Sequence, residues 1–173
     1  QVNKIKTILR NSYKKGKDQP KNVGGLVRDN KLSGQRTQVY HDRRTGQTVV
    51  NHRGTQGLKD VITDGALSVG LLKKTNRFKH AQNISNKAKA KYGNNITNTG
   101  HSLGGAIAEN VKGSKKVVTF NKPVTLQNVG KRVSKKQTDI KTSNDPVSVL
   151  RGLQKGNKAT VLKSRSRNLL REH

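Results

Sequence analysis

The hydrophobic positions of this chain fall into short runs with strand-like spacing and longer runs with helical spacing. Strands are predicted over residues 35–41, 47–52, 96–99, 115–120, 138–142 and 159–163. Helices are predicted over residues 71–92 and 103–111. Because strands that alternate with helices are typical of βαβ units, the pattern predicts an α/β fold with a mostly parallel sheet flanked by helices.

The first two predicted strands are expected to form a β-hairpin. Gln35–His41 and Gln47–His52 are separated by the polar segment Asp42–Gly46, in which the glycine comes late, as in a hairpin turn. The long helical segment is expected to stop at Tyr92, because Gly93 follows it.

The start of the chain is polar and basic, and several Pro and Gly residues interrupt it. We interpret residues 1–34 as a basic arm, in part disordered, that precedes a globular domain over residues 35–173. The alternative is an ordered amphipathic helix near the start, because Ile5, Ile8 and Leu9 would share one face of such a helix.

The composition is strongly basic and poor in hydrophobic residues. The 173 residues include 37 Lys and Arg against 9 Asp and Glu, which gives a formal net charge of +28. Only 29% of the residues are hydrophobic and 3% are aromatic, so the core is expected to be small and aliphatic. The absence of cysteine excludes disulfides and thiolate metal sites. No apolar run has the length of a membrane span and no signal-peptide core is visible, which leaves the localisation open between options such as a secreted or a virion-associated protein.

So large a positive charge predicts anionic surroundings. The partners that fit are an anionic membrane surface, non-specific nucleic acid or an acidic protein. The basic residues are scattered along the chain, and aromatic residues that could stack on bases are nearly absent. Attraction to phosphate groups is therefore favoured over the reading of bases.

The segment Gly100–Gly105, with the sequence Gly-His-Ser-Leu-Gly-Gly, lies between a predicted strand and a predicted helix. A serine with a glycine two residues away on each side permits a tight strand-to-helix turn, from which the hydroxyl projects at the carboxyl edge of the sheet. The N-terminus of the helix would face the same point, where its N–H groups can stabilise an oxyanion. Ser102 is therefore the candidate nucleophile, and the alternative is an ordinary glycine-rich turn.

A serine nucleophile needs a base that takes its proton and an acid that orients the base. In a fold with this turn both follow the serine in the chain, the acid first. Asp139 and Asp145 are the aspartates that follow Ser102, and Asp145 is preferred because it comes after a predicted strand, whereas Asp139 lies at that strand's start. His173 is the one histidine after Ser102, so it is the candidate base by elimination. The alternative for this last residue is a solvated side chain.

The other histidines are weaker candidates for the base. His101 is expected to pack beside the nucleophile, His41 and His52 belong to predicted strands, and His80 belongs to a predicted helix. Neither the histidines nor the carboxylates show the spacing of metal ligands. We therefore predict no metal and no cofactor.

An oxyanion formed at Ser102 would need two hydrogen-bond donors. The backbone N–H of Leu103, the residue after the nucleophile, is the first. The second comes from a loop after an earlier strand, where Thr55 follows Arg53 and Gly54. The alternative for these three residues is a simple turn at the end of a strand.

Four stretches of the chain resemble the class 3 lipases, α/β-hydrolases that act on acylglycerols and phospholipids, in their residues, order and spacing. They are Val49–Thr55 with Asp60 and Thr63-Asp64, the complete match Gly100–Gly105, Val117–Pro123, and Asn144–Val147. The resemblance covers about residues 35–150 and implies an α/β-hydrolase fold. The active-site residues that it implies are the triad Ser102, Asp145 and His173 and the oxyanion donors Thr55 and Leu103.

Three positions depart from the pattern of that family. His52 replaces an aromatic residue, Val61 stands where a lid tryptophan is usual, and Asn121 replaces a glycine. The segment between Thr55 and Asp64 is too short for a substantial lid. The resemblance therefore implies a small, lid-poor member.

Together these observations predict a serine ester hydrolase of lipase or phospholipase type, with acylglycerols or anionic phospholipids as substrates. One alternative is a structural or nucleic-acid-packaging protein on a lipase-like fold, for example a minor virion component, with or without residual activity. A plain nucleic-acid-binding protein would explain the charge but would leave the four stretches unexplained.

Overall fold

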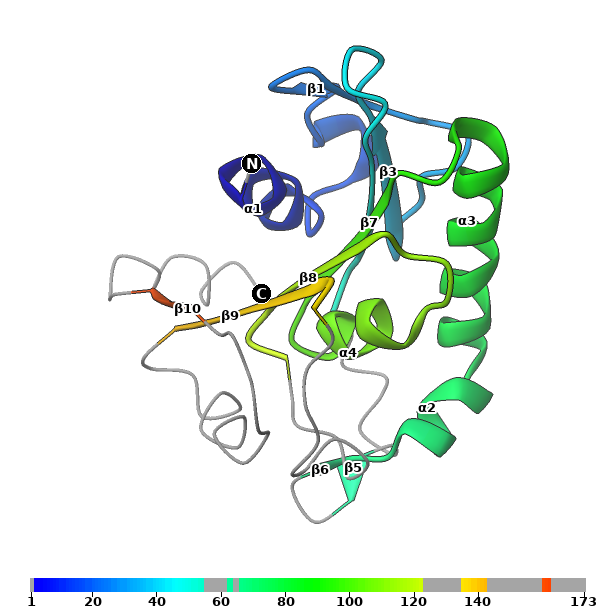
Figure 1. Cartoon of the computed structure of the whole chain (residues 1–173), viewed down its shortest axis with the longest axis vertical. Helices are drawn as coiled ribbons and strands as arrows, with labels where there is room; N and C mark the ends of the chain where they lie inside the picture. Colours follow the sequence, from blue (N-terminus) through cyan, green and yellow to red (C-terminus); the bar gives the residue numbers. More distant parts are fainter. Residues whose placement is uncertain (1, 55–61, 64–65, 123–134, 143–159, 163–173) are drawn as a thin grey trace.

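The computed structural model describes residues 2–54, 62–63, 66–122, 135–142 and 160–162 (Figure 1). Its helices are α1 (Val2–Asn11), the 3-10 turn η1 (Gly16–Asp18), α2 (Val69–Lys74), α3 (Asn76–Tyr92) and α4 (Leu103–Asn110). Its strands are β1 (Asn22–Val23), β2 (Leu26–Arg28), β3 (Thr37–His41), β4 (Thr48–His52), β5 (Ile62–Thr63), β6 (Ala66–Leu67), β7 (Ile96–His101), β8 (Lys116–Phe120), β9 (Gln137–Thr142) and β10 (Thr160–Leu162). Each strand predicted from the sequence has a counterpart among them.

One mixed sheet dominates the fold, with the strand order β1-β2-β3-β4-β7-β8-β9-β10. Neighbouring strands are antiparallel from β1 to β4 and parallel from β4 through β7, β8 and β9 to β10. The short strands β5 and β6 form a separate antiparallel pair. The predicted α/β fold with a mostly parallel sheet flanked by helices is therefore confirmed, and the carboxyl ends of β4 and of β7 to β10 share one edge of the sheet.

Helices cover both faces of the sheet (Figure 1). Helix α1 lies on one face, where Ile5, Ile8 and Leu9 pack against side chains of β3, β4, β8 and β9. Helices α2, α3 and α4 lie on the other face, where Phe78 and Ala81 of α3 pack against α4. The sheet is thus the middle of three layers.

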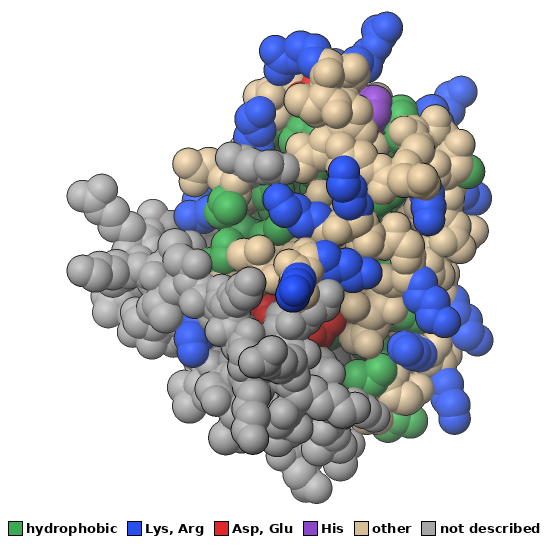
Figure 2. All heavy atoms as spheres, viewed as in Figure 1, with side chains coloured by type: hydrophobic (Ala, Val, Ile, Leu, Met, Phe, Trp, Pro, Cys, Tyr) green, Lys and Arg blue, Asp and Glu red, His purple; other side chains and the backbone are tan. Residues whose placement is uncertain are grey.

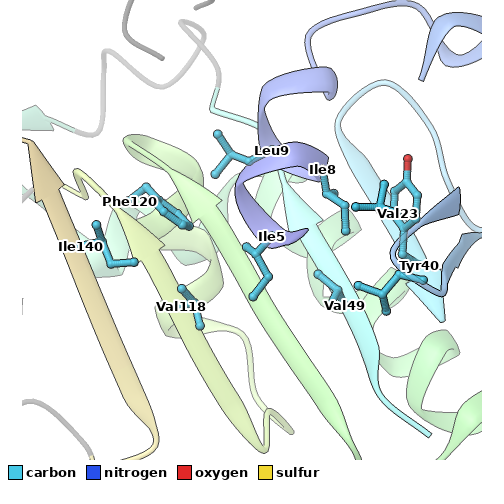
Figure 3. Close-up of a cluster of buried hydrophobic side chains, with 10 residues drawn as sticks. Ile5, Ile8, Leu9, Val23, Tyr40, Val49, Val118, Phe120 and Ile140 are labelled. Atoms are coloured by element: carbon cyan, nitrogen blue, oxygen red, sulfur yellow. The ribbon is translucent and has the colours of Figure 1, made fainter. Parts of the chain in front are cut away.

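The segment interpreted as a basic arm instead belongs to the folded structure. Ile5, Ile8 and Leu9 are at most 2% exposed and reach the sheet side chains as shown in Figure 3. β1 and β2 extend the sheet beyond β3. The alternative of an ordered amphipathic helix is therefore the correct one, because burying each of these apolar side chains contributes about 2 kcal/mol that a solvated arm would forgo.

The local signals for turns and helix ends hold in the structure. β3 and β4 form the predicted hairpin, and Gly46 in its turn has a φ of 76°. The predicted helix over residues 71–92 is divided at Thr75, whose side chain accepts a hydrogen bond from the Phe78 N–H and so begins α3. Gly93, with a φ of 98°, ends that helix as expected.

The positive charge is distributed over the surface. Lys and Arg side chains are spread across the described part of the face shown in Figure 2, over several elements, and do not gather into one patch. No helix among the described residues is long and apolar enough to cross a membrane.

Candidate active site

Ser102 occupies a strained turn between β7 and α4. Its backbone has a φ of 56° and a ψ of −123°, a conformation that few residues other than glycine adopt. The Ser102 N–H donates to the Phe120 carbonyl at 2.8 Å, and the Gly105 N–H donates to the Ser102 carbonyl at 3.0 Å. These bonds hold the strained peptide between β8 and the first turn of α4. The half-buried serine side chain thus lies at the carboxyl edge of the parallel strands.

The glycines of this turn are required by close backbone contacts. A Cβ on Gly100 would lie 2.2 Å from the carbonyl carbon and oxygen of Gly104, and a Cβ on Gly104 would lie 2.0 Å from the His52 carbonyl oxygen. Real Cβ atoms do not approach other atoms so closely, so α4 can start against β7 and β4 only with glycine at both positions. The segment is therefore the strand–turn–helix unit that the sequence predicts around Ser102.

Leu103, the first expected oxyanion donor, is the first residue of α4. N–H groups in the first turn of a helix have no acceptor within that helix, and the Leu103 N–H, directly after Ser102, is one of them. The partly buried Leu103 side chain packs against the cluster formed by α2, α3 and α4, which fixes the start of the helix.

The chain that leads to the second expected donor passes beside the nucleophile. A Cβ on Gly54 would lie 2.8 Å from the His101 carbonyl oxygen and 3.4 Å from the Tyr13 hydroxyl. Thr55 follows Gly54 directly, but it lies outside the described residues, as do the candidate acid Asp145 and the candidate base His173.

Two of the other histidines are engaged within the sheet. Burial and the nearby charge of Arg77 lower the pKa of His52 to about 3, and the ring is 2.7 Å from the Asn98 side-chain oxygen. His41 stacks on the ring of Tyr92 at 4.0 Å between centroids, and burial lowers its pKa.

The remaining two histidines differ in burial. His101 is buried on β7 directly before the nucleophile, in line with the expectation that it packs there. His80 is exposed on α3, and partial burial together with Arg77 and Arg36 lowers its pKa.

A buried charged cluster, which was not predicted from the sequence, lies beneath α4. Lys122 is 0% exposed, and its Nζ lies 2.5 Å from Glu109 Oε1 and 3.6 Å from Asp139 Oδ2. Asp139 also accepts hydrogen bonds from Thr119 and Gln137. Lys122 comes two residues after the end of β8. A lone lysine at the carboxyl end of an apolar strand is therefore the feature of the sequence that could have pointed to this cluster.

The same cluster contains Asp139, the other aspartate considered for the role of catalytic acid beside Asp145. Asp139 lies inside β9, paired in register with Thr119 of β8, and its side chain is 0% exposed. Its carboxylate is thus committed to partners on the face covered by α4.

A further group of basic residues gathers where β3 begins and β4 ends. Arg77 of α3 is 5% exposed, and its Nη2 donates to the Arg36 carbonyl at 2.5 Å and to the Arg53 carbonyl at 3.0 Å. Burial and the charges of Arg36 and Arg53 lower the pKa of Arg77 to about 10. In a helix rich in lysine and asparagine, nothing in the sequence marks Arg77 as a buried residue.

Comparison with known proteins identifies the family. Residues 13–165 match a family described as phospholipase-like, the Tle-like phospholipase domain. The chain belongs to this family. Membership in the Tle-like phospholipase domain family supports a phospholipase- or lipase-type function and implies a lipid substrate. It agrees with the lipase resemblance at this level, without singling out the class 3 lipases.

The matched region of the Tle-like phospholipase domain contains the turn at Ser102, both charged clusters and Asp145. It begins at Tyr13, before the strands of the sheet. No curated protein matches the chain. Among the described residues, no group of three or more His, Cys, Asp and Glu side chains is arranged to hold a metal ion.

Proposed function

We propose that this chain is a serine ester hydrolase that cleaves acyl esters of phospholipids. Ser102 Oγ attacks the ester carbonyl while His173 takes the serine proton and Asp145 orients the imidazole. The Leu103 N–H and Thr55 stabilise the oxyanion. The alcohol leaves with the proton returned by His173, and water then hydrolyses the acyl-enzyme by the same route.

The conformation of Ser102 is the observation that carries this proposal. A non-glycine residue with a φ of 56° is strained, at a cost of about 1–3 kcal/mol. Such strain persists where the surrounding structure enforces it, and here the close contacts of Gly100 and Gly104 do so. In a turn of this kind, the strained backbone directs the serine hydroxyl to the point between the end of the strand and the first N–H groups of the helix.

The strand directions support the other assignments. Thr55 comes three residues after β4, Ser102 comes directly after β7, and Asp145 comes three residues after β9. His173 follows β10. Since β4 and β7 to β10 are parallel, their carboxyl ends lie along one edge, where the sites of open α/β sheets are built. Each proposed residue thus follows a strand that ends at the edge where Ser102 lies.

The distributed positive charge supports an anionic phospholipid surface as the place of action. Each Lys or Arg near such a surface contributes about 1 kcal/mol to binding. The charge of +28 on 173 residues also suits the second candidate function, a nucleic-acid-packaging or structural protein on the same fold. The strained serine favours the hydrolase.

Hydrolysis of phosphatidylglycerol vesicles by the chain and its variants tests the proposal. We expect Ser102→Ala to lower turnover by a factor on the order of 10⁶ and His173→Ala to lower it similarly. His80→Ala, which removes an exposed histidine of α3, serves as the matched control and should leave turnover unchanged. Turnover that survives Ser102→Ala would overturn the mechanism, and loss with Ser102→Ala alone would show that another base serves. An inert chain that binds DNA with a steep salt dependence would favour the second function.

A further inference from the structure

Three arginines meet at the edge of the sheet where β3 begins and β4 ends. Arg36 directly precedes β3 and Arg53 directly follows β4. The Arg53 N–H donates to the Arg36 carbonyl at 2.9 Å, so these two residues lie opposite each other next to the antiparallel pair. Arg77 donates to both of their carbonyls from α3. The backbone positions of Arg36 and Arg53 are therefore fixed by three hydrogen bonds.

This group of positive charges lacks a compensating carboxylate in the described part of the chain. The ion pairs found there join acidic side chains to Arg44, Lys91 and Lys122, and none involves Arg36, Arg53 or Arg77. The Nε of the buried Arg77 has no hydrogen-bond partner among the described residues. Like charges at opposite positions of a strand pair are destabilising, and a buried cation is costly without an anion. An arrangement of this kind is suited to an anionic ligand.

The backbone of Arg53 adjoins the helix turn that follows the nucleophile. A Cβ on Gly104, in the first turn of α4, would lie 3.0 Å from the carbonyl carbon of Arg53. The Arg53 guanidinium carbon lies 5.8 Å from the centre of the Tyr13 ring, and this cation–π contact holds its side chain next to Gly54. The side chain of Arg53 is half-buried and that of Arg36 is exposed, so both are accessible to a ligand.

We propose that Arg36 and Arg53 bind the phosphate group of a phospholipid whose acyl ester is attacked by Ser102. This inference rests on the proposed function. The phosphate and the acyl esters of a glycerophospholipid are joined only through glycerol, so a phosphate site must adjoin the nucleophile. Guanidinium groups bind phosphate oxygens in pairs of charge-assisted hydrogen bonds, which gives orientation as well as affinity. Arg36 and Arg53 thus select lipids that carry phosphate over neutral acylglycerols.

A comparison of two substrates tests the proposal. The first is dihexanoylphosphatidylcholine below its micellar concentration, and the second is p-nitrophenyl butyrate, an ester without phosphate. For the double variant Arg36→Gln/Arg53→Gln we expect kcat/KM to fall about 10- to 100-fold on the phospholipid and to stay unchanged on the butyrate. Arg43→Gln, in the exposed β3–β4 turn at the opposite end of the same strands, is the matched control and should change neither. Equal losses on both substrates, or an equal loss with Arg43→Gln, would overturn the proposal.

A binding measurement separates this inference from the proposed function. In the Ser102→Ala background, calorimetry should show that the two Arg→Gln substitutions weaken binding of dihexanoylphosphatidylcholine by about 10-fold or more. If binding depends on the two arginines but the chain with Ser102 intact hydrolyses neither ester, the phosphate site is supported and the proposed hydrolase function is overturned. An affinity for the lipid that both substitutions leave unchanged would overturn the phosphate site. Inorganic phosphate that binds as tightly as the lipid would show a site for free phosphate and contradict the headgroup assignment.

Discussion

A Cβ on Gly104 would lie 2.0 Å from the carbonyl oxygen of His52, so the first turn of α4 and the end of β4 are in direct backbone contact. This contact joins the helix that follows the nucleophile to the strand that leads to Arg53, Gly54 and Thr55. The first turn of α4 and the end of β4, two parts of the chain that are far apart in the sequence, are thereby held side by side.

Gly104→Ala should separate these two parts. We expect a loss of about 1–3 kcal/mol in the free energy of unfolding, because the backbone must shift to admit the methyl group. Esterase activity should fall about 100-fold or more, because a displacement of about 1 Å misplaces the reacting groups. Gly70→Ala is the matched control, since nothing lies within 4 Å of a Cβ at that position of α2, and it should stabilise the helix by up to about 1 kcal/mol. Urea denaturation measures the free energy of unfolding of both variants, and an ester assay measures their activity. Similar behaviour of the two variants would contradict the close contact.

The strain at Ser102 predicts a difference between two inactive variants. Glycine adopts a positive φ without strain, whereas alanine at this position remains strained. Ser102→Gly should therefore be more stable to unfolding than Ser102→Ala by about 1 kcal/mol. The gain is limited because glycine also raises the entropy of the unfolded chain. Thermal denaturation of both variants measures the difference. Equal stabilities would mean that the turn is relaxed.

The buried cluster beneath α4 predicts a large cost for removing its cation. Lys122→Met leaves the carboxylates of Glu109 and Asp139 without their positive partner, and we expect a loss of about 3–5 kcal/mol in stability. Adding Glu109→Gln and Asp139→Asn should recover a good part of this loss. Lys116→Met, at an exposed position of β8, should change stability by less than about 0.5 kcal/mol. A Lys122→Met chain as stable as this control in urea would show that the ion pairs contribute little.

His52 predicts a loss of stability in acid. Its folded-state pKa of about 3 lies below the ordinary value of 6.5, because burial disfavours the charged ring. The unfolded chain therefore binds a proton first, and the stability present above pH 6.5 is lost as the pH falls toward 3, at up to about 1.4 kcal/mol per pH unit. His52→Gln should reduce this slope between pH 6 and 4 in urea denaturation series. A slope equal to that of the unsubstituted chain would assign the acid sensitivity to other groups.

Much of the fold follows from local patterns in the sequence. The hairpin of β3 and β4, the end of α3 at Gly93 and the turn at Ser102 rest on spacing and on glycines whose roles are local. Asn121 is a further case, because the class 3 pattern has glycine there and the structure has a φ of 52°, which asparagine tolerates better than most residues. Local steric requirements of this kind can be deduced from sequence.

Features that depend on distant partners could not be predicted. The apolar residues of α1 were recognised as one face of a helix, but a basic, Gly- and Pro-rich context favoured an arm, and β1 and β2 are too short to show alternation. Lys122 and Arg77 are typical surface residues by type, and their burial depends on carboxylates and carbonyls contributed by other elements. Sequence patterns report periodicity but not which charges meet.

The most direct test of the proposed nucleophile is covalent labelling with an alkyl fluorophosphonate. Such a reagent bonds to an activated serine oxygen through phosphorus and releases fluoride, whereas ordinary serines react poorly with it. Peptide mass spectrometry should find the adduct on Ser102 in the unsubstituted chain, and the adduct should be absent after Ser102→Ala. Asp145→Asn and His173→Ala should each slow the labelling about 100-fold or more, because the serine then loses its activated state. No adduct at Ser102, or labelling at an equal rate in the three chains that retain the serine, would contradict a catalytic triad built on this turn.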